Sequence, residues 1–557
     1  MVVDGQPATP QPLVDWSLVT QPQPGLDGRL IHYTQGKTFG GGSSRNYMAY
    51  HRGTVGTFDQ WADLLGDSTY AWKNILPYFE KSVRFTPPNP DKLGSETAAF
   101  IEHDPDAFSS SGGPLQVSYS SYYQPQSPFV KKAFQQLGMA PIDGLNSGKL
   151  MGYADATLTI DPKDGTRSSS HTSFLAEVLN SPRINLQVYH NTFATKILFD
   201  NDKKATNVKV STAGSEYVLS ARKEVILSAG AFKSPQLLML SGIGPAATLH
   251  EFGIPVISDL PGVGQNMWDQ PLFGVVSKVN VTTGTALQTK PKYMDRALRE
   301  FLRDGSGPLS SPYYDALGWE KIPEPLRSEL SDLSLTTLSN FPEDWPELEF
   351  LPMAAQLAPI SPDDPNMYSS MFIVNVAPLS RGNVTLASAD PFQNPLVSPN
   401  WLVDKTDQEV CIAGIKRARQ ALAATGITVG EEVAPGPDVQ SNEEVLAYLR
   451  QTTIPIHHAS ATNRMGKEGD KMRVLNSQAK VLGVKGLRVV DASSFPNSPP
   501  GHIQSTVYML AEKIADNIKE ERRNTESESM GFYQGSKQGV SRDSGEVMDH
   551  FTHHEEL

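Results

Sequence analysis

Residues 486–513 read GLRVVDASSFPNSPPGHIQSTVYMLAEK, and this stretch indicates the fold more clearly than any other part of the chain. An apolar run predicts a strand ending at Asp491, and a loop rich in Pro and Gly then presents His502. The next residues predict a helix that Ser505 or Thr506 can cap, with an apolar stripe of Val507, Leu510, Ala511, Ile514 and Ile518. In open α/β sheets ligands bind beyond the carboxyl ends of the strands, so His502 is placed at a ligand-binding edge.

A second segment of the same kind spans residues 224–245, EVILSAGAFKSPQLLMLSGIGP. It predicts a buried strand, a glycine turn and a helix with Ser234 as N-cap, Pro235 at its first position and Gly242 at its stop. This order is typical of a parallel-sheet unit of the dinucleotide-binding type. The chain has no GxGxxG motif, since GVGQNM from Gly262 lacks the third glycine.

Composition limits the function classes. A chain of 557 residues should hold at least two domains, and its net charge of -13, without a basic patch, argues against nucleic acid or an anionic membrane surface as a partner. The single cysteine, Cys411, excludes an internal disulfide and a cysteine-based metal cluster. No apolar run is long enough to span a bilayer, and residues 1–12 lack the apolar core of a signal peptide. A small-molecule enzyme fits best, in a compartment that the sequence leaves open.

The segments between these units predict loops and a second sheet. Residues 36–53, GKTFGGGSSRNYMAYHRG, form a glycine cluster suited either to close backbone approach to a ligand or to a surface loop. Short runs from Met371 (MFIVNVAPL) and Asn383 (NVTLAS) predict strands, and residues 407–424 predict an amphipathic helix. Residues 523–557 have no apolar period and predict a disordered tail.

Taken together and in this order, these segments resemble the glucose-methanol-choline (GMC) oxidoreductases, a family of FAD-dependent alcohol-oxidising flavoproteins. The resemblance covers roughly residues 15–519. Residues 230–244 agree with the family's second signature at every constrained position. In the first signature, residues 36–46, Phe39 replaces the usual aliphatic residue and Arg45 stands where an apolar residue is expected. The stretches RNYMAYHRGT and PPGHIQSTVYMLAEK are most similar to fungal members that act in secondary metabolism.

The resemblance implies an α/β fold with two domains. An FAD-binding domain with a Rossmann-like parallel sheet, truncated at its N-terminus, would comprise residues 1–69, 151–272 and 451–522. An α+β substrate-binding domain built on an antiparallel sheet would comprise residues 70–150 and 273–450. The family begins with a strand, the GxGxxG turn, a helix and a second strand ending in an acid, about 30 residues that this sequence does not contain. Without this unit we expect the FAD pyrophosphate to lose its main anchor. Either the gene model is truncated or the product is impaired.

The resemblance also assigns the catalytic residues. The family's general base matches His458 in HHASAT, and its second active-site partner matches His502. A neutral imidazole can take the hydroxyl proton of an alcohol while hydride passes to flavin N5. His457 is interpreted as a packing neighbour, although a shift of one residue in the alignment would exchange it with His458. His32, His51 and His171 lack metal-ligand spacing and are interpreted as core or surface histidines, and no metal is expected.

The cofactor positions follow from the same motifs. The isoalloxazine and ribityl are expected near Gly41, Gly42, Asn46, Tyr47 and Ala49. Ala194 stands where a Val usually meets adenine, Asp491 and Ala492 should face the phosphate side, and Ile503 joins His502 at the helix start. For the glycines and alanines, plain close packing is the alternative interpretation.

Three functions are therefore considered. The leading hypothesis is an FAD-linked oxidoreductase that oxidises a small aromatic or polyketide-derived alcohol, with oxygen or another electron acceptor. The second is a lyase or cyclase that retains FAD as structure and uses His458 only as an acid or base. The third is an inactive, truncated pseudoenzyme. No nucleic-acid partner and no membrane span are expected.

Overall fold

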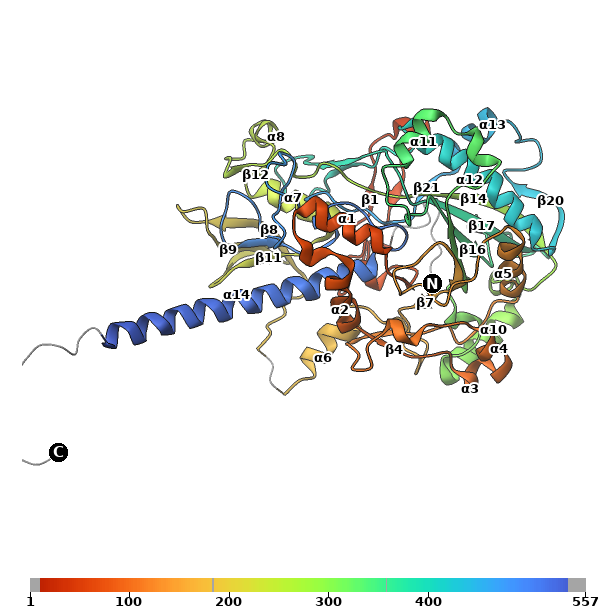
Figure 1. Ribbon diagram of the computed structural model, residues 1–557, viewed down its shortest axis with the longest axis horizontal. Coiled ribbons are helices and arrows are strands. Elements are labelled where there is room, and N and C mark those ends of the chain that lie inside the picture. Colours follow the sequence, from red (N-terminus) through yellow and green to blue (C-terminus); the bar gives the residue numbers. More distant parts are fainter. Residues whose placement is uncertain (1–10, 183–184, 357, 539–557) are drawn as a thin grey trace, which may run out of the picture. The chain divides into compact units, whose positions relative to one another are not determined.

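The computed structural model describes residues 11–182, 185–356 and 358–538 (Figure 1). The chain separates into two compact units, Met1–Glu512 and Lys513–Leu557. Every strand of the described residues belongs to the first unit, and the second unit contributes the later part of one helix.

The largest element is an antiparallel sheet of seven strands in the order β20-β14-β17-β16-β15-β6, with β21 also paired to β14 (Figure 1). Its strands are β6 (Gly152–Asp155), β14 (Pro271–Val279), β15 (Ala316–Glu320), β16 (Leu348–Met353), β17 (Met367–Asn375), β20 (Thr428–Ala434) and β21 (Ile454–Pro455). Every residue of the neighbours β16 and β17 is buried, because both faces of the sheet are covered. The antiparallel sheet expected for the substrate-binding domain is confirmed.

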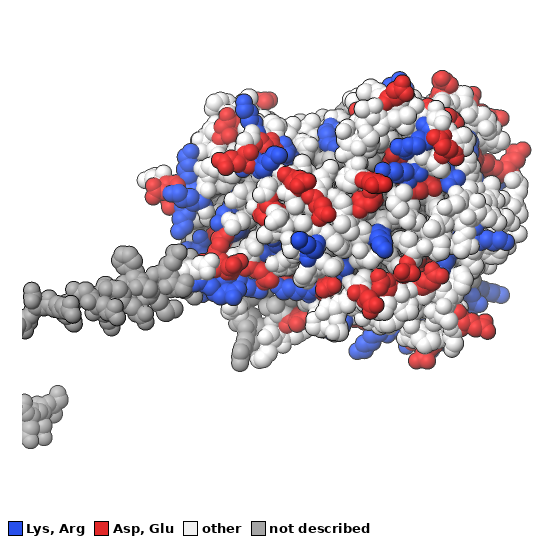
Figure 2. All heavy atoms as spheres, viewed as in Figure 1, with Lys and Arg blue, Asp and Glu red and all other residues white. Residues whose placement is uncertain are grey.

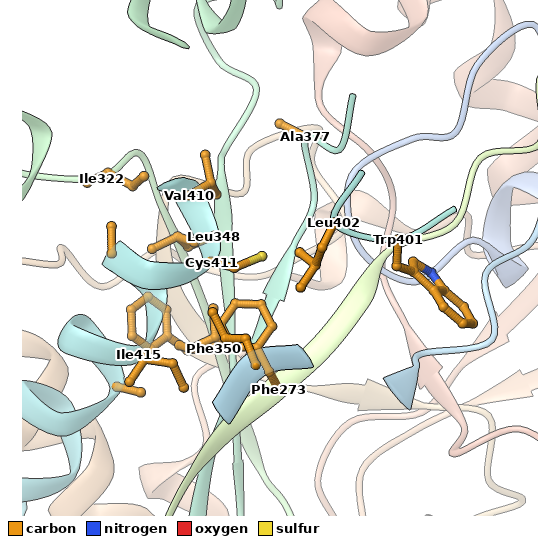
Figure 3. Packing of buried hydrophobic residues seen from close by; sticks show 14 of the residues in the cluster. Phe273, Ile322, Leu348, Phe350, Ala377, Trp401, Leu402, Val410, Cys411 and Ile415 are labelled. Atoms are coloured by element: carbon orange, nitrogen blue, oxygen red, sulfur yellow. The ribbon is translucent and has the colours of Figure 1, made fainter. Parts of the chain in front are cut away.

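The helix α12 (Lys405–Ala424) packs against β14 and β17 of this sheet. It begins two residues before the predicted start because Asp404 caps it, accepting a hydrogen bond from the backbone N–H of Thr406 at 2.8 Å. A Cβ at Gly414 would lie 2.9 Å from the ring of Phe273, so this glycine permits close approach of helix and sheet. Figure 3 shows Phe273 and the buried Cys411 in the resulting core.

The predicted strand at Met371 lies within β17, and the one at Asn383 is β18 (Asn383–Thr385). The strand β18 pairs with β19 (Leu396–Ser398) in a separate two-stranded sheet. The strand β6 belongs to the large antiparallel sheet, although it lies in the range assigned to the cofactor domain. The division into two domains by residue ranges stays a prediction.

The two α/β segments meet through parallel pairing of β11 (Val225–Leu227) with β22 (Leu487–Val489). Residue Val225 stands opposite Leu487, and Leu227 opposite Val489. The segments that follow β11 and β22 therefore leave the sheet at the same edge, because parallel strands have their carboxyl ends on the same side. This pairing confirms the predicted parallel unit and places Asp491 and the loop carrying His502 beyond that edge.

The helix α7 (Gly230–Leu240) begins four residues before the predicted N-cap, so Ser234 and Pro235 lie inside it. The reason is a cap from another segment: the Asp491 carboxylate accepts hydrogen bonds from the backbone N–H of Gly230 at 2.9 Å and the hydroxyl of Ser234 at 2.5 Å. A cap from a distant acid leaves no trace in the local sequence. The stop is as predicted, with Gly242 at φ +86° just after the helix.

Inside this helix, Pro235 cannot donate a hydrogen bond to the carbonyl of Ala231, four residues earlier. The hydroxyl of Thr462 donates to that carbonyl instead, at 2.7 Å. Thr462 is fully buried, and its side chain therefore replaces the backbone bond that the proline removes.

The helix α14 (Gln504–Gln538) begins two residues after His502, so Ser505 and Thr506, the predicted caps, lie in its first turn. The Ser505 hydroxyl is used otherwise, donating to the carbonyl of His51 at 2.5 Å. Residues 523–538 are helical, which corrects the predicted disordered tail there; adding a residue to an existing helix needs no new nucleus, so α14 continues through residues of modest helix propensity. Residues 539–557 lie outside the described residues.

The remaining strands form small sheets, and the rest of the described helices connect them. The three-stranded sheet consists of β8 (Thr192–Phe199), β9 (Ala205–Thr212) and β10 (Ser215–Ser220). The two-stranded sheets are β1 (Leu18–Val19) with β2 (His32–Tyr33), β3 (Ala49–Tyr50) with β7 (Thr157–Leu158), β4 (Val83–Phe85) with β5 (Leu115–Val117), and β12 (Ile243–Gly244) with β13 (Ser258–Asp259). The other α-helices are α1 (Val55–Leu65), α2 (Trp72–Ser82), α3 (Pro90–Leu93), α4 (Ser95–Phe100), α5 (Ser127–Gln136), α6 (Ala176–Leu179), α8 (Ala246–Glu251), α9 (Thr285–Thr289), α10 (Pro291–Asp304), α11 (Asp332–Leu338) and α13 (Asn442–Thr452).

Figure 2 shows basic and acidic side chains interspersed over the visible face. Within the described residues, no helix has both the length and the apolar character needed to cross a bilayer.

The pairing of Thr462 with Ala231 can be tested by substitution. Thr462→Val leaves the buried carbonyl without the hydroxyl, and we expect it to lower the free energy of unfolding by about 1–3 kcal/mol. Adding Pro235→Ala restores a backbone N–H four residues beyond Ala231 and should recover part of that loss. Urea denaturation of both variants measures the coupling, with Thr462→Ser as the control that keeps the hydroxyl. An equal loss in the single and double variants would contradict the assignment.

Candidate functional site

The histidine predicted at the start of α14 is held by a second histidine. The backbone N–H of His502 donates to Nε2 of His51 at 2.7 Å, and the two rings lie edge to face with centroids 5.5 Å apart. His51 directly follows β3, so the end of the glycine-rich segment meets the loop before α14. The preceding residue, Gly501, has φ +80°, a backbone conformation that glycine adopts most easily.

The structure brings the two predicted catalytic histidines together. Their ring centroids are 5.0 Å apart and the ring planes are inclined at 78°. His458 follows β21 and is 8% exposed. Its neighbour His457 contacts a different group, the ring of Tyr33, edge to face at 5.0 Å.

The hydrogen bonds of His458 fix its tautomer. Its Nδ1 lies 2.9 Å from Oε1 of Gln270, and the amide nitrogen of Gln270 donates to the carbonyl of Pro499 at 3.1 Å. That second bond orients the amide, so its oxygen must accept from Nδ1–H of His458. The lone pair of the neutral ring is therefore on Nε2, which could accept a proton.

Burial favours the uncharged form of His458. It lowers the pKa of His458 well below the usual 6.5, and the nearby histidines, His502 first among them, lower it further. The backbone N–H of His458 donates to Oδ1 of Asp269 at 3.0 Å, which fixes the main chain beside the ring. Burial also raises the pKa of Asp269 to about 7.

An acid from the antiparallel sheet lies beside the second histidine. Oε1 of Glu349, in β16, is 2.9 Å from Nε2 of His502, an ion-pair distance although the geometry is too bent for a hydrogen bond. Glu349 has no exposed surface. A carboxylate buried among histidines favours one placement of the His502 ring, because an unpaired buried charge is costly.

The glycine-rich segment is joined to the start of α14 through Asn46 and Gln504. The amide nitrogen of Asn46 donates to Oε1 of Gln504 at 3.0 Å, and the amide nitrogen of Gln504 donates to the carbonyl of Ala49 at 2.5 Å. Oδ1 of Asn46 accepts from Arg167 at 2.6 Å. The predicted cofactor positions Asn46 and Ala49 thus lie next to the histidine pair.

The residues present fit a flat cofactor in two respects. A Cβ added at Gly41 or Gly42 would meet no protein atom within 4 Å, so this part of the segment faces open space. The hydroxyls of Ser498 and Thr506, on the loop and first turn around His502, are buried without hydrogen-bond partners among the described residues. Buried hydroxyls of this kind are normally paired, and a polar ligand could pair them.

The other predicted positions differ in their surroundings. Both oxygens of the Asp491 carboxylate are engaged, with Gly230, Ser234 and the backbone N–H of Ser493, so its observed role is to join β22 to α7. Ala492 begins the short 3-10 helix Ala492–Ser494, and Ile503 lies between His502 and α14. The backbone carbonyl of Tyr47 accepts from the hydroxyl of Tyr314 at 2.9 Å.

Ala194 lies on β8 and lines an open hollow of about 360 Å³ together with residues of β9, β10 and β11, among them Val225. Residues of the histidine site do not line this hollow. Whether adenine binds there stays a prediction.

Sequence reasoning did not find Gln270, Asp269 or Glu349. Glu349 could have been found, because it is an acid inside the apolar run LEFLPM. A charged residue in a buried strand normally has a partner or a function. Gln270 precedes β14 with nothing to distinguish it, and His51 was interpreted only as a core or surface histidine. Within the described part of the chain, no group of three or more His, Cys, Asp or Glu side chains is arranged to hold a metal ion.

Known proteins of similar sequence are fungal enzymes. Patulin synthase of Aspergillus clavatus is 45% identical over 91% of this chain and 82% of its own length. Versicolorin B synthase of Aspergillus parasiticus is 41% identical over 90% of this chain and 78% of its own length.

Solved structures agree in fold. An FAD-dependent oxidoreductase from Chaetomium thermophilum has a TM-score of 0.82 at 29% identity, covering 93% of this chain and 92% of that one. A fungal aryl-alcohol oxidase has a TM-score of 0.79 at 25% identity, covering 93% and 91%. Two family models, both described as GMC oxidoreductase, match residues 13–272 and 378–511. The chain therefore belongs to the GMC oxidoreductases and is an FAD-dependent enzyme of that family.

Proposed function

We propose that the protein oxidises the CH–OH group of a small aromatic or polyketide-derived alcohol, with His458 as general base and oxygen or another acceptor taking the electrons. The observation that carries the proposal is the Nε2 lone pair of His458, which the Nδ1 bond to Gln270 leaves available, in a ring whose centroid lies 5.0 Å from that of His502. The names of the similar fungal proteins, which include patulin synthase and an aryl-alcohol oxidase, support this substrate class.

When bound, FAD supplies the acceptor for the hydride that leaves the carbinol carbon. The chain's own task is to move the hydroxyl proton. Nε2 of His458 takes that proton, and the ring then carries a positive charge that the Oε1 of Gln270 continues to stabilise at Nδ1. Burial excludes water from the base, so the proton passes between alcohol and imidazole directly.

His502 acts from the other side of the pair. Its backbone is fixed by His51 and its ring by Glu349, so its position does not depend on the substrate. A ring held there can orient the substrate hydroxyl toward Nε2 of His458. The buried hydroxyls of Ser498 and Thr506 would help to hold the cofactor beside this pair.

The test is the visible spectrum of the protein purified after expression with riboflavin. A flavin band that bleaches when an aromatic alcohol is added without oxygen is expected. A stable band that no alcohol bleaches, together with conversion of a substrate without change of oxidation state, would favour the lyase or cyclase function instead. Protein without a flavin band would contradict the proposal.

Replacement of the base should be far more harmful than replacement of its neighbour. We expect His458→Asn to lower kcat/KM by about 10²–10⁴-fold, the usual contribution of a general base. His457→Asn is the matched control, because Asn tolerates the positive φ of +67° at that position and His457 packs against Tyr33. Steady-state kinetics at saturating acceptor measure both. A large loss in His457→Asn alone would mean that the two histidines had been exchanged in the assignment.

The Gln270 contact predicts a pH effect. The base works when unprotonated, and burial lowers the pKa of His458, so activity is expected to be present above that low pKa and lost as the pH falls through it. Gln270→Glu places a carboxylate beside Nδ1–H, raises the pKa of His458 and should move the acid limb of kcat/KM up by roughly one to three pH units.

Gln270→Met keeps the side-chain length and removes the acceptor, and serves as the control. It should lower the plateau without moving the acid limb upward. The same acid limb in the wild type and in Gln270→Glu would show that His458 is not the group titrating.

A further inference from the structure

His51 lies at the meeting point of several elements of the site. It is 1% exposed, and its ring lies 4.9 Å from that of Trp319 in β15 and 5.5 Å from that of His502. In the alcohol oxidation proposed above, the ring of His51 neither contacts the alcohol nor carries a proton. A buried titratable group with defined partners calls for an explanation of its own.

The partners of His51 determine where its proton is. A backbone N–H can only donate, so Nε2 of His51 must accept from His502 at 2.7 Å. The proton of the neutral ring is therefore on Nδ1, which donates to the carbonyl of Arg52 at 3.0 Å. The carbonyl of His51 in turn accepts from Ser505 in the first turn of α14. His51 thus ties down both the residue before α14 and the start of that helix.

The ring of His51 packs closely against Gly501. A Cβ at Gly501 would lie 2.5 Å from Cε1 and Nε2 of His51, so the ring is in direct contact with the backbone of the turn that carries His502. Displacement of this ring would free the turn, and with it the direction of the His502 side chain.

We propose that His51 is a positioning residue: its unprotonated Nε2 holds the backbone of His502 and thereby aims the His502 ring at His458. The inference rests on the proposed function, in which the His458 and His502 pair handles the alcohol. His51 acts through His502, whereas His458 meets the substrate hydroxyl.

The surroundings of His51 make this device sensitive to acid. The titratable groups that act on it are His502 and Glu349 of β16, with His458 beyond His502, and the backbone carbonyl of Arg52 accepts a hydrogen bond from its Nδ1. Burial lowers the pKa of His51 to about 4, the charge of His502 adds to this, and Glu349 opposes it. Protonated Nε2 would place an N–H against the N–H of His502 and break the contact.

The sign of the stability effect follows from the lowered pKa. The unfolded chain binds the proton near pH 6.5 and the folded protein only near 4, so the contribution of neutral His51 to stability is full above 6.5 and is lost as the pH falls toward 4. His457 and His458 contribute in the same direction, and the difference between wild type and a His51 variant isolates the part that belongs to His51.

The experiment compares His51→Gln with His51→Leu in the flavin-bound enzyme. The side-chain oxygen of Gln can take the place of Nε2 as an acceptor that does not titrate, whereas Leu fills the space and cannot accept. We expect His51→Leu to lower kcat by about 10–100-fold with little change in KM, because loss of orientation acts on the reacting geometry. His51→Gln should restore most of kcat and lose less stability than the wild type between pH 6.5 and 4.

A readout without turnover comes from crystal structures of the two variants. The His502 ring should move relative to His458 in His51→Leu and stay in place in His51→Gln. Full activity of His51→Leu with His502 unmoved would overturn the proposal. An equal loss of kcat in both variants, each well folded, would also overturn it, because the effect would then belong to the packing of the His51 ring on Trp319. Should His51→Leu fail to fold, a folded but inactive His51→Gln would still overturn it.

The oxidation of an alcohol and the positioning of His502 by His51 can be tested separately. A wild-type enzyme that oxidises no alcohol would remove the proposed function, while the crystal structures and the pH dependence of stability would still decide whether His51 holds His502.

Discussion

The carboxylate of Asp491 is the constraint on which the site depends. It receives the N–H of Gly230 and the hydroxyl of Ser234 from α7 and the N–H of Ser493 from its own segment, so one buried acid joins β22 to the helix after β11. Charge-assisted bonds of this kind are about twice as strong as neutral ones. Because the loop from Asp491 to His502 begins at this junction, the place of the histidine follows from the way the parallel unit is closed.

The site itself lies where that loop meets the antiparallel sheet. Gln270 lies just before β14, Glu349 lies in β16 and His51 lies just after β3, and each contacts one histidine at one atom. Buried polar groups are costly when unpaired and rigid when paired, so such a network stabilises a single arrangement of the two rings. The arrangement is therefore a property of the fold and does not depend on a bound substrate.

The sequence predicted what local patterns and motifs determine. The strands and helices around Asp491 and Gly242, the antiparallel sheet, and the pairing of His458 with His502 were all predictable, because periodicity and signatures are local. Contacts between distant segments could not be predicted. Because Asp491 caps α7, the helix begins earlier than predicted, and because Thr462 binds the carbonyl of Ala231, Pro235 can lie inside the helix. Gln270 and His51 became recognisable only through the atoms they contact, since single polar residues carry no period.

The pKa shifts show that burial disfavours charge at this site. Burial lowers the pKa of His51 and His458 and raises that of Asp269 to about 7, so His458 and the groups around it tend toward their uncharged forms. Taking a proton from an alcohol creates charge in this environment, and charge created there is felt strongly because little water screens it. Such a site gains most from groups that are already oriented, which Gln270 provides at Nδ1 of His458 and His51 provides at the backbone of His502. The fold therefore contributes to the chemistry through the contacts that orient the two histidines, more than through the number of charges.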